Sequence, residues 1–180
     1  MEWRSGGQGR LAVVVNTSYR AAPGADVLYA GDYAWFERYA VDAAKVFRGR
    51  VWTGDLLTAQ QWPGVSLVKR VSGDRLPADG ICVGGIAGNS GLQAVCFAAL
   101  GGAMRIGLLG FDGGPSGGRS HWHEPHQAPL RPCFASETWP AMFKRAAEQL
   151  QARGVRVTNC SRETRIDAFP RGSLEEWISS

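Results

Sequence analysis

The sequence of 180 residues contains no apolar run of about 18 residues, the length that a membrane-spanning helix requires. Its first ten residues, MEWRSGGQGR, are polar and glycine-rich, and so lack the apolar core of a secretory signal peptide. The cysteines, Cys82, Cys96, Cys133 and Cys160, form no C-x-x-C pair. We therefore expect a cytoplasmic protein without a membrane partner, in which all the cysteines are free thiols.

Two common nucleotide-binding motifs are also missing. The glycine-rich segment GGIAGNSG at residues 84–91 matches neither G-x-G-x-x-G nor the P-loop pattern G-x-x-x-x-G-K-[ST]. The sequence therefore lacks the motifs that usually indicate a dinucleotide dehydrogenase or a P-loop NTPase. The sequence has neither H-E-x-x-H nor paired cysteines, so we expect no resident metal.

The composition is that of a single globular domain. Hydrophobic residues make up 44% of the chain and charged residues 20%, and a chain of this length can bury a sizeable core without disulfides or metals. The formal net charge of +4 suits a phosphate-bearing partner, but it is too small to establish nucleic-acid binding. We expect one domain over residues 1–180, with residues 1–10 flexible.

Strand and helix patterns alternate along the chain. Residues 11–15, LAVVV, form the β-branched run typical of a strand buried on both faces of a parallel sheet. We expect further strands at residues 25–30, 50–53, 65–71, 105–111 and 155–159. We expect helices at residues 33–44, directly after the turn at 84–91, at 140–153 and at 173–178. The alternation predicts an α/β fold: one Rossmann-like, doubly wound, mostly parallel sheet flanked by helices, with the order of the middle strands left open.

Polar residues follow several of these strands, at the sheet edge where ligands bind in open parallel sheets. Asn16 and Thr17 follow the first strand, and Asp32 follows the second and stands where it would cap the next helix. The turn before a later helix is formed by Gly88, Asn89, Ser90 and Gly91. A helix start of this kind offers free backbone N–H groups to a phosphate. The alternative is structural: Asn89 or Ser90 only caps the helix, and the glycines only permit close packing.

The connection at residues 112–135 is too long for a plain linker, so we expect it to be functional. Asp112 opens it and either binds a ribose hydroxyl or a metal, orients a base, or forms an Asx-turn. All the histidines of the chain, His121, His123 and His126, lie in the segment SHWHEPH. They are candidates for a general base, and His123 leads because Trp122 and Glu124 flank it. A three-histidine zinc site and solvent-exposed histidines are the alternatives.

The segments GNSGLQAVCFAALGGAMRIGLLGFD, GGRSHWHEPH and VRVTNCSRETRIDAFPRGSLEEW resemble a group of uncharacterised proteins of phages and prophages. The segment NTSYRAAPGADVLYAGDYAWFERY is similar to the N-terminal part of that group, so the resemblance covers most of the chain. The group is distantly similar to Rossmann-like bacterial sialyltransferases, motility-associated glycosyltransferases and archaeal 6-hydroxymethylpterin diphosphokinases. This resemblance implies a nucleotide-using transferase in which Asn16 and the turn at 88–91 hold the nucleotide, Asp112 closes the following strand, and a histidine is the base.

We therefore expect a glycosyltransferase that moves a sugar from a nucleotide-sugar co-substrate to an acceptor hydroxyl without a metal. A hydroxymethylated DNA base of a phage is a candidate acceptor, and the protein would then act in the host cell cytoplasm. An ATP-dependent diphosphokinase or other phosphoryl transferase, with Mg²⁺ on Asp112 and Asp32, is the first alternative. A non-catalytic nucleotide-binding phage protein is the second, and a homo-oligomer is left open.

Overall fold

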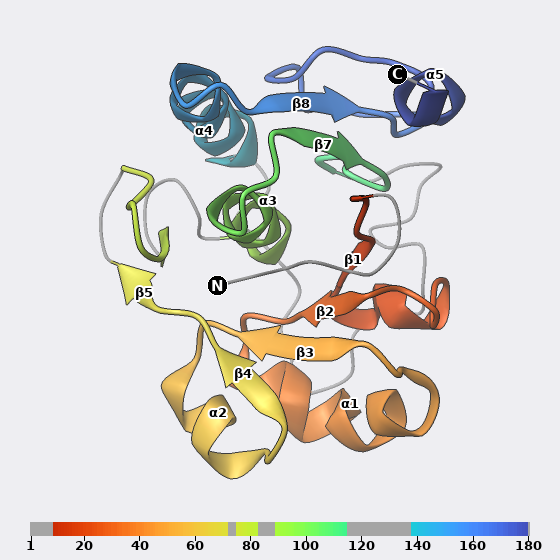
Figure 1. Cartoon of the computed structure of the whole chain (residues 1–180), viewed down its shortest axis with the longest axis vertical. Helices are drawn as coiled ribbons and strands as arrows, with labels where there is room; N and C mark the ends of the chain where they lie inside the picture. The colour runs from red at the N-terminus through yellow and green to blue at the C-terminus, as the bar shows by residue number, and fades with distance from the viewer. Residues whose placement is uncertain (1–8, 72–74, 83–88, 115–137, 180) are drawn as a thin grey trace. The chain divides into compact units, whose positions relative to one another are not determined.

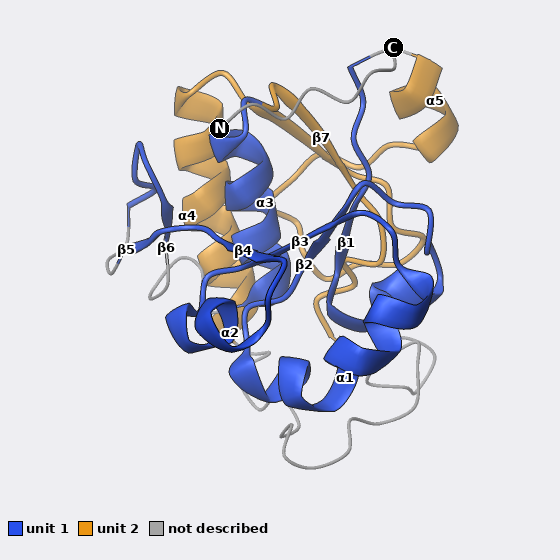
Figure 2. Cartoon of the chain, turned by 60° about the horizontal axis from the view of Figure 1, so that its bottom comes forward, with its two compact units in different colours: residues 1–102 blue, residues 103–180 orange. Residues whose placement is uncertain are grey.

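A computed structural model describes residues 9–71, 75–82, 89–114 and 138–179 of the chain (Figure 1). The chain divides into two compact units, residues 1–102 and residues 103–180, which Figure 2 distinguishes by colour. Each unit is described by itself. The expectation of one domain over the whole chain stays a prediction.

The first unit contains a four-stranded parallel sheet. Its strands stand in sequence order: β1 (Val13–Val15), β2 (Val27–Tyr29), β3 (Arg50–Thr53) and β4 (Val65–Leu67). In the register, Val15 lies beside Tyr29, and Tyr29 lies beside Trp52. Because all these pairings are parallel, the carboxyl ends of the strands meet at one edge of the sheet.

Helices cover both faces of this sheet. In Figures 1 and 2, α1 (Tyr33–Val46) and α2 (Leu56–Gln61) lie on one side of the strands and α3 (Ser90–Leu100) on the other. The Phe97 ring of α3 packs against the Tyr29 and Trp52 rings, with centroids 5.4 Å apart in both pairs. The predicted α/β fold, a parallel sheet flanked by helices, is confirmed.

The core of the first unit follows from the pattern of its sequence. Strand β2 is buried throughout, as expected for a central strand of a parallel sheet. Helix α1 is amphipathic and buries Trp35, Phe36, Tyr39 and Ala43, which recur at helical spacing. The 3₁₀ helix η1 (Asn16–Arg20) connects β1 to β2.

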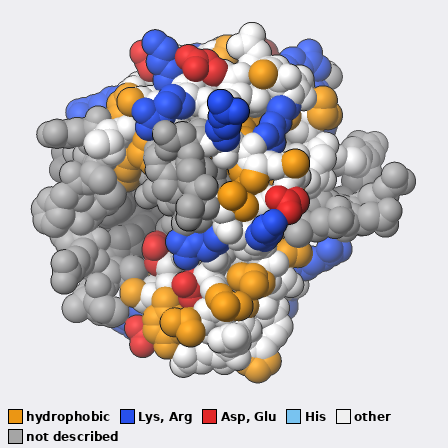
Figure 3. All heavy atoms as spheres, turned by 90° about the vertical axis from the view of Figure 1, so that its left-hand side faces the viewer, with side chains coloured by type: hydrophobic (Ala, Val, Ile, Leu, Met, Phe, Trp, Pro, Cys, Tyr) orange, Lys and Arg blue, Asp and Glu red, His pale blue; other side chains and the backbone are white. Residues whose placement is uncertain are grey.

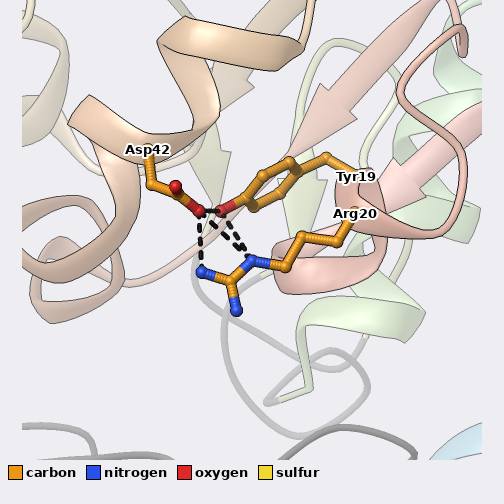
Figure 4. Close-up of polar contacts among 3 residues, drawn as sticks. All are labelled: Tyr19, Arg20 and Asp42. Carbon is orange, nitrogen blue, oxygen red and sulfur yellow. Dashed lines mark hydrogen bonds and ion pairs between the residues drawn. The ribbon is translucent and has the colours of Figure 1, made fainter.

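The connection η1 is fastened to α1 by a polar cluster (Figure 4). The Tyr19 hydroxyl donates a hydrogen bond to the Asp42 carboxylate, and the Arg20 guanidinium pairs with the same carboxylate at 2.7 Å. These contacts hold the pKa of Asp42 below its usual range, because the hydrogen bonds from Tyr19 and Arg20 favour the charged form. Burial and the Asp42 hydrogen bond raise the pKa of Tyr19 to about 12.

Two expectations for the middle of the first unit were wrong in detail. The strand expected at 65–71 is divided into β4 and β5 (Arg70–Val71), because the chain changes partners there. The Val68 N–H donates to the Thr53 carbonyl, whereas the carbonyl of the following residue, Lys69, accepts from the Ile81 N–H. Strand β5 therefore pairs with β6 (Ile81–Cys82) instead of β3. Helix α2 was not expected at all.

The second unit contains a parallel strand pair, β7 (Arg105–Leu108) and β8 (Arg156–Asn159), with α4 (Trp139–Ala152) against β8. The expected tail helix is present as α5 (Leu174–Ser179). Asn159 is fully buried and donates from Nδ2 to the Thr164 hydroxyl at 3.1 Å. Its Oδ1 accepts from the Ser161 N–H, so the loop after β8 is held by a satisfied polar network.

Within the described part of the chain, no helix is long and apolar enough to cross a membrane. Cys96 and Cys160 are buried and form no disulfide. Cys133 lies outside the described residues.

Candidate ligand-binding site

The carboxyl edge of the four-stranded sheet carries a polar residue after each strand. Asn16 follows β1 directly, Asp32 lies three residues after the end of β2, and Asp55 lies two residues after the end of β3. Arg70 follows β4 and opens β5. All belong to the first unit, so its fold alone brings them to one edge.

Asp32 is hydrogen-bonded to a residue of α3 and not to α1, the helix that it was expected to cap. It occupies the N-cap position of α1, but its side chain accepts no capping hydrogen bond there. Its carboxylate is instead hydrogen-bonded to the side chain of Ser90, the first residue of α3. The prediction that Asp32 caps α1 was therefore wrong, because a partner distant in sequence takes the carboxylate.

Burial raises the pKa of the Asp32 carboxyl above its usual range. The Arg70 guanidinium and the Ser90 hydrogen bond act in the opposite direction, and the Asp55 carboxylate adds to the rise. Asp32 nevertheless remains partly exposed, so its carboxylate is accessible to the hydroxyl donors of a ligand.

Asp55 and Arg70 form a loose ion pair next to Asp32. One oxygen of Asp55 caps α2, accepting from the N–H and the hydroxyl of Thr58, both at 2.8 Å. The other oxygen lies 3.7 Å from Nη1 of Arg70, which is beyond hydrogen-bond range. The absence of a side chain at Gly54 lets the Arg70 stem lie close to the backbone, since a Cβ there would be 3.0 Å from Arg70 Cγ.

The first turn of α3 is fixed to β2 by a second hydrogen bond. The fully buried Tyr29 donates from its hydroxyl to Oε1 of Gln93 at 2.7 Å. Burial raises the pKa of Tyr29, so this hydroxyl remains a donor at neutral pH. Gly31 leaves the room for this contact, because a Cβ at Gly31 would lie 2.5 Å from the same Gln93 oxygen.

Asn16 has two unusual features at the end of β1. Its φ of 50° lies in the left-handed region, where asparagine is among the most tolerated side chains other than glycine. Its Oδ1 atom is buried and has no hydrogen-bond partner. A buried acceptor left without a donor costs about 1–3 kcal/mol. The neighbouring Thr17, also predicted to bind the nucleotide, is only 2% exposed, so its side chain is covered by protein.

The start of α3 combines the structural and the functional interpretations. Asn89 caps the helix, with its Oδ1 accepting from the Leu92 N–H at 3.1 Å, as the structural alternative predicts. Ser90, by contrast, is hydrogen-bonded to Asp32 across the sheet edge. Gly91 is the second residue of α3, and Gly88 lies outside the described residues.

The remaining predicted residues lie in the second unit or outside the described residues. Asp112 is in the second unit, where burial and then the nearby Glu163 carboxylate raise its pKa. Its backbone carbonyl accepts from the Arg165 N–H at 2.7 Å. His121, His123 and His126 lie outside the described residues.

Sequence reasoning missed Asp55, Arg70, Gln93 and Tyr29. Asp55 carried the same signal as Asp32, an acidic residue two or three residues after the end of a strand. Arg70 was hidden inside an expected strand. The Tyr29–Gln93 hydrogen bond joins residues 64 positions apart, and no local sequence pattern predicts it.

No family model, curated protein or solved structure matches this chain. The resemblance to phage proteins and glycosyltransferases therefore stays an expectation. In residues 9–71, 75–82, 89–114 and 138–179 there is no group of three or more His, Cys, Asp and Glu side chains that could hold a metal.

Proposed function

We propose that the first unit binds a nucleotide-sugar and that the protein is a glycosyltransferase. The observation that carries this proposal is the hydrogen bond between Asp32 and Ser90 at the carboxyl edge of the parallel sheet. A carboxylate at the end of the second strand commonly accepts hydrogen bonds from ribose hydroxyls in folds of this class. The adjoining start of an 11-residue helix is a favourable position for the phosphates.

Each side chain of the cluster then has a part in binding. The Asp32 carboxylate accepts from the ribose hydroxyls, and the Ser90 hydroxyl is released to donate to a phosphate oxygen. Arg70 retains donors that its 3.7 Å ion pair does not use, and its positive charge favours a diphosphate. The buried Oδ1 of Asn16 accepts a donor of the ligand and is thereby satisfied.

The chemical step places developing negative charge on the diphosphate. The acceptor hydroxyl attacks the anomeric carbon, its proton passes to a base, and the bond from the sugar to the nucleoside diphosphate breaks. Arg70 stabilises the leaving diphosphate because a preorganised cation acts where charge develops. The base is proposed from the sequence alone: His123 first, then His126 and His121, with Asp112 as an orienting partner.

The first experiment measures binding. Isothermal titration calorimetry of the full chain with nucleoside diphosphates, in wild type and in Asp32→Asn, tests the ribose contact. We expect Asp32→Asn to lose about 10- to 100-fold in affinity, the range for a hydrogen bond to a charged group. Glu37→Gln is the matched control, because Glu37 is an exposed carboxylate of α1. Equal affinities in Asp32→Asn and Glu37→Gln, or no binding by wild type, would contradict the proposal.

The second experiment identifies the reaction. Donor hydrolysis is measured across UDP-sugars, CMP-sugars, GDP-sugars and ATP, with and without EDTA. We expect turnover of one nucleotide-sugar that survives EDTA and is lost in His123→Ala. Turnover in a variant with all three histidines changed to alanine would remove the histidines from the mechanism.

A phosphoryl transferase is the second candidate, and one observation favours it. Asp55 is close enough to Asp32 to raise its pKa, so two carboxylates share the sheet edge. A Mg²⁺ ion between them would relieve their repulsion and hold the phosphates of ATP. ATP turnover that EDTA abolishes and Mg²⁺ restores would support this candidate over the first.

A further inference from the structure

A recess of about 590 Å³ opens beside this cluster, between α2 and the end of β4. It is lined on the α2 side by Leu56 and Leu57 and on the β4 side by Leu67, whose exposed fractions are 56%, 64% and 42%. Figure 3 faces this side of the molecule and shows hydrophobic side chains gathered in its lower half, with basic and acidic side chains above them. Exposed leucines that converge on a hollow are typical of a binding site for an apolar surface.

We infer that this recess holds the nucleobase of the bound nucleotide. The inference rests on the proposed function and adds to it the part of the ligand that lies beyond the ribose. Planar bases have apolar faces and polar edges. A site for a base therefore needs apolar walls together with hydrogen-bonding groups at one end, and the recess supplies both.

The walls come from two different elements. Leu56 and Leu57 belong to α2, and Leu67 is the last residue of β4, so they contribute apolar surface from two sides of the hollow. The volume exceeds what a single ring system needs and falls within the range of small-ligand pockets, about 300–1,000 Å³.

The polar end of the recess is formed by Asp55 and Arg70, which also line it. Their 3.7 Å separation leaves an acceptor on the carboxylate and donors on the guanidinium. A base edge presents donors, and the Asp55 oxygen that does not cap α2 can accept from it, whereas the Arg70 guanidinium remains available to the diphosphate of the proposed function. The ion pair thus joins the recess to the Asp32 cluster, because Arg70 also lowers the pKa of Asp32.

The position along the sheet agrees with the length of a nucleoside. Asp32 follows β2, and the recess lies at the ends of β3 and β4, the next strands in the sheet. Neighbouring strands are about 4.8 Å apart, so the recess is about 5–10 Å from the ribose position. A ribose on Asp32 can therefore direct its base into the recess.

The test compares a ligand with a base to one without. Binding of the four common nucleoside diphosphates and of inorganic pyrophosphate to the full chain is measured by calorimetry in wild type, Leu56→Ser and Leu67→Ser. Met104→Ser is the matched control, because Met104 is a similarly large apolar residue with the same 56% exposure and lies outside the recess.

We expect each leucine variant to weaken the tightest-binding nucleoside diphosphate by about three- to tenfold, the effect of losing contact with about half a leucine side chain. Pyrophosphate affinity should stay unchanged, and Met104→Ser should match wild type for both ligands. If nucleotides bind and both leucine variants keep wild-type affinity, the recess does not hold the base, although the proposed function survives. If wild type binds no nucleotide, the proposed function fails and the inference fails with it.

Discussion

Gly31→Ala offers a sharp test of how α3 is held against β2. Alanine at this position would place its Cβ 2.5 Å from Oε1 of Gln93, too close for a carbon and an oxygen. The same Cβ would lie 3.4 Å from Oγ of Ser90, which is ordinary contact. The substitution should therefore displace Gln93 while leaving Ser90 and its hydrogen bond to Asp32 in place.

The cost arises at Tyr29, whose hydroxyl donates to the displaced oxygen at 2.7 Å. Tyr29 is 0% exposed, so water cannot replace Gln93, and a buried unpaired hydroxyl costs about 1–3 kcal/mol. Replacing glycine by alanine also stabilises by about 0.4–1 kcal/mol through the unfolded chain. The first effect is larger, so we expect the free energy of unfolding to fall by roughly 0.5–2 kcal/mol.

A double-mutant cycle identifies the source of that loss. Urea denaturation, followed by circular dichroism, is measured for wild type, Gly31→Ala, Tyr29→Phe and the double variant. The Tyr29→Phe background has no hydroxyl that could lose its hydrogen-bond partner, so Gly31→Ala should there be neutral or slightly stabilising. An equal loss from Gly31→Ala in both backgrounds would refute the argument, because the cost would then come from elsewhere.

Three further outcomes follow from the geometry of the first unit. Because the pKa of Asp32 is raised, its carboxylate becomes protonated at a higher pH than an ordinary aspartate does. As the pH is lowered, calorimetry should therefore show nucleotide affinity beginning to fall at that higher pH, and Asp32→Asn should remove this dependence. Because the pKa of Asp42 is lowered, its stabilisation is present above the ordinary aspartate range and lost as the pH falls through the lowered value. Asp42→Asn should cost at most about 1 kcal/mol in urea denaturation at pH 7, since the ion pair is about half exposed, and this difference should vanish in acid. Gly49→Ala should lower the urea midpoint strongly, because its Cβ would lie 2.4 Å from the Asp26 carbonyl, whereas Gly24→Ala meets open space and should not.

The parts of the fold that depend on local periodicity were predictable from the sequence. The strand at Arg50–Thr53 was predicted with the bounds observed, and α1 begins at the predicted residue, Tyr33. In α1 the apolar residues recur at helical spacing, and in the four-residue strand the strand-favouring Val51 and Trp52 carry the signal. Helix α2 has only six residues, too few for a period to emerge, and its clearest signal is the Asp55 cap on Thr58.

The candidate site was predictable only where strand ends alone decide it. The rule that ligands lie beyond the carboxyl ends of parallel strands selected Asn16 and Asp32, and a helix start selected Ser90. It did not select Arg70, because the division of 65–71 into two strands depends on which carbonyls lie opposite Val68 and Ile81. Nor did it select Gln93, whose contact with Tyr29 exists only after α3 has packed on the sheet.

The places where local rules fail are gathered at this same edge. Asp32 stands at a helix N-cap and forms no capping hydrogen bond there, although Asp55, in the equivalent position one strand along, caps α2 fully. Asn16 adopts a left-handed conformation and leaves a buried oxygen unpaired. A sequence selected for stability alone would use both side chains locally, as it does at Asp55 and Asn89. Because departures from local consistency concentrate at functional sites, the Asp32 and Asn16 exceptions favour a ligand at the carboxyl edge of this sheet, independently of any resemblance.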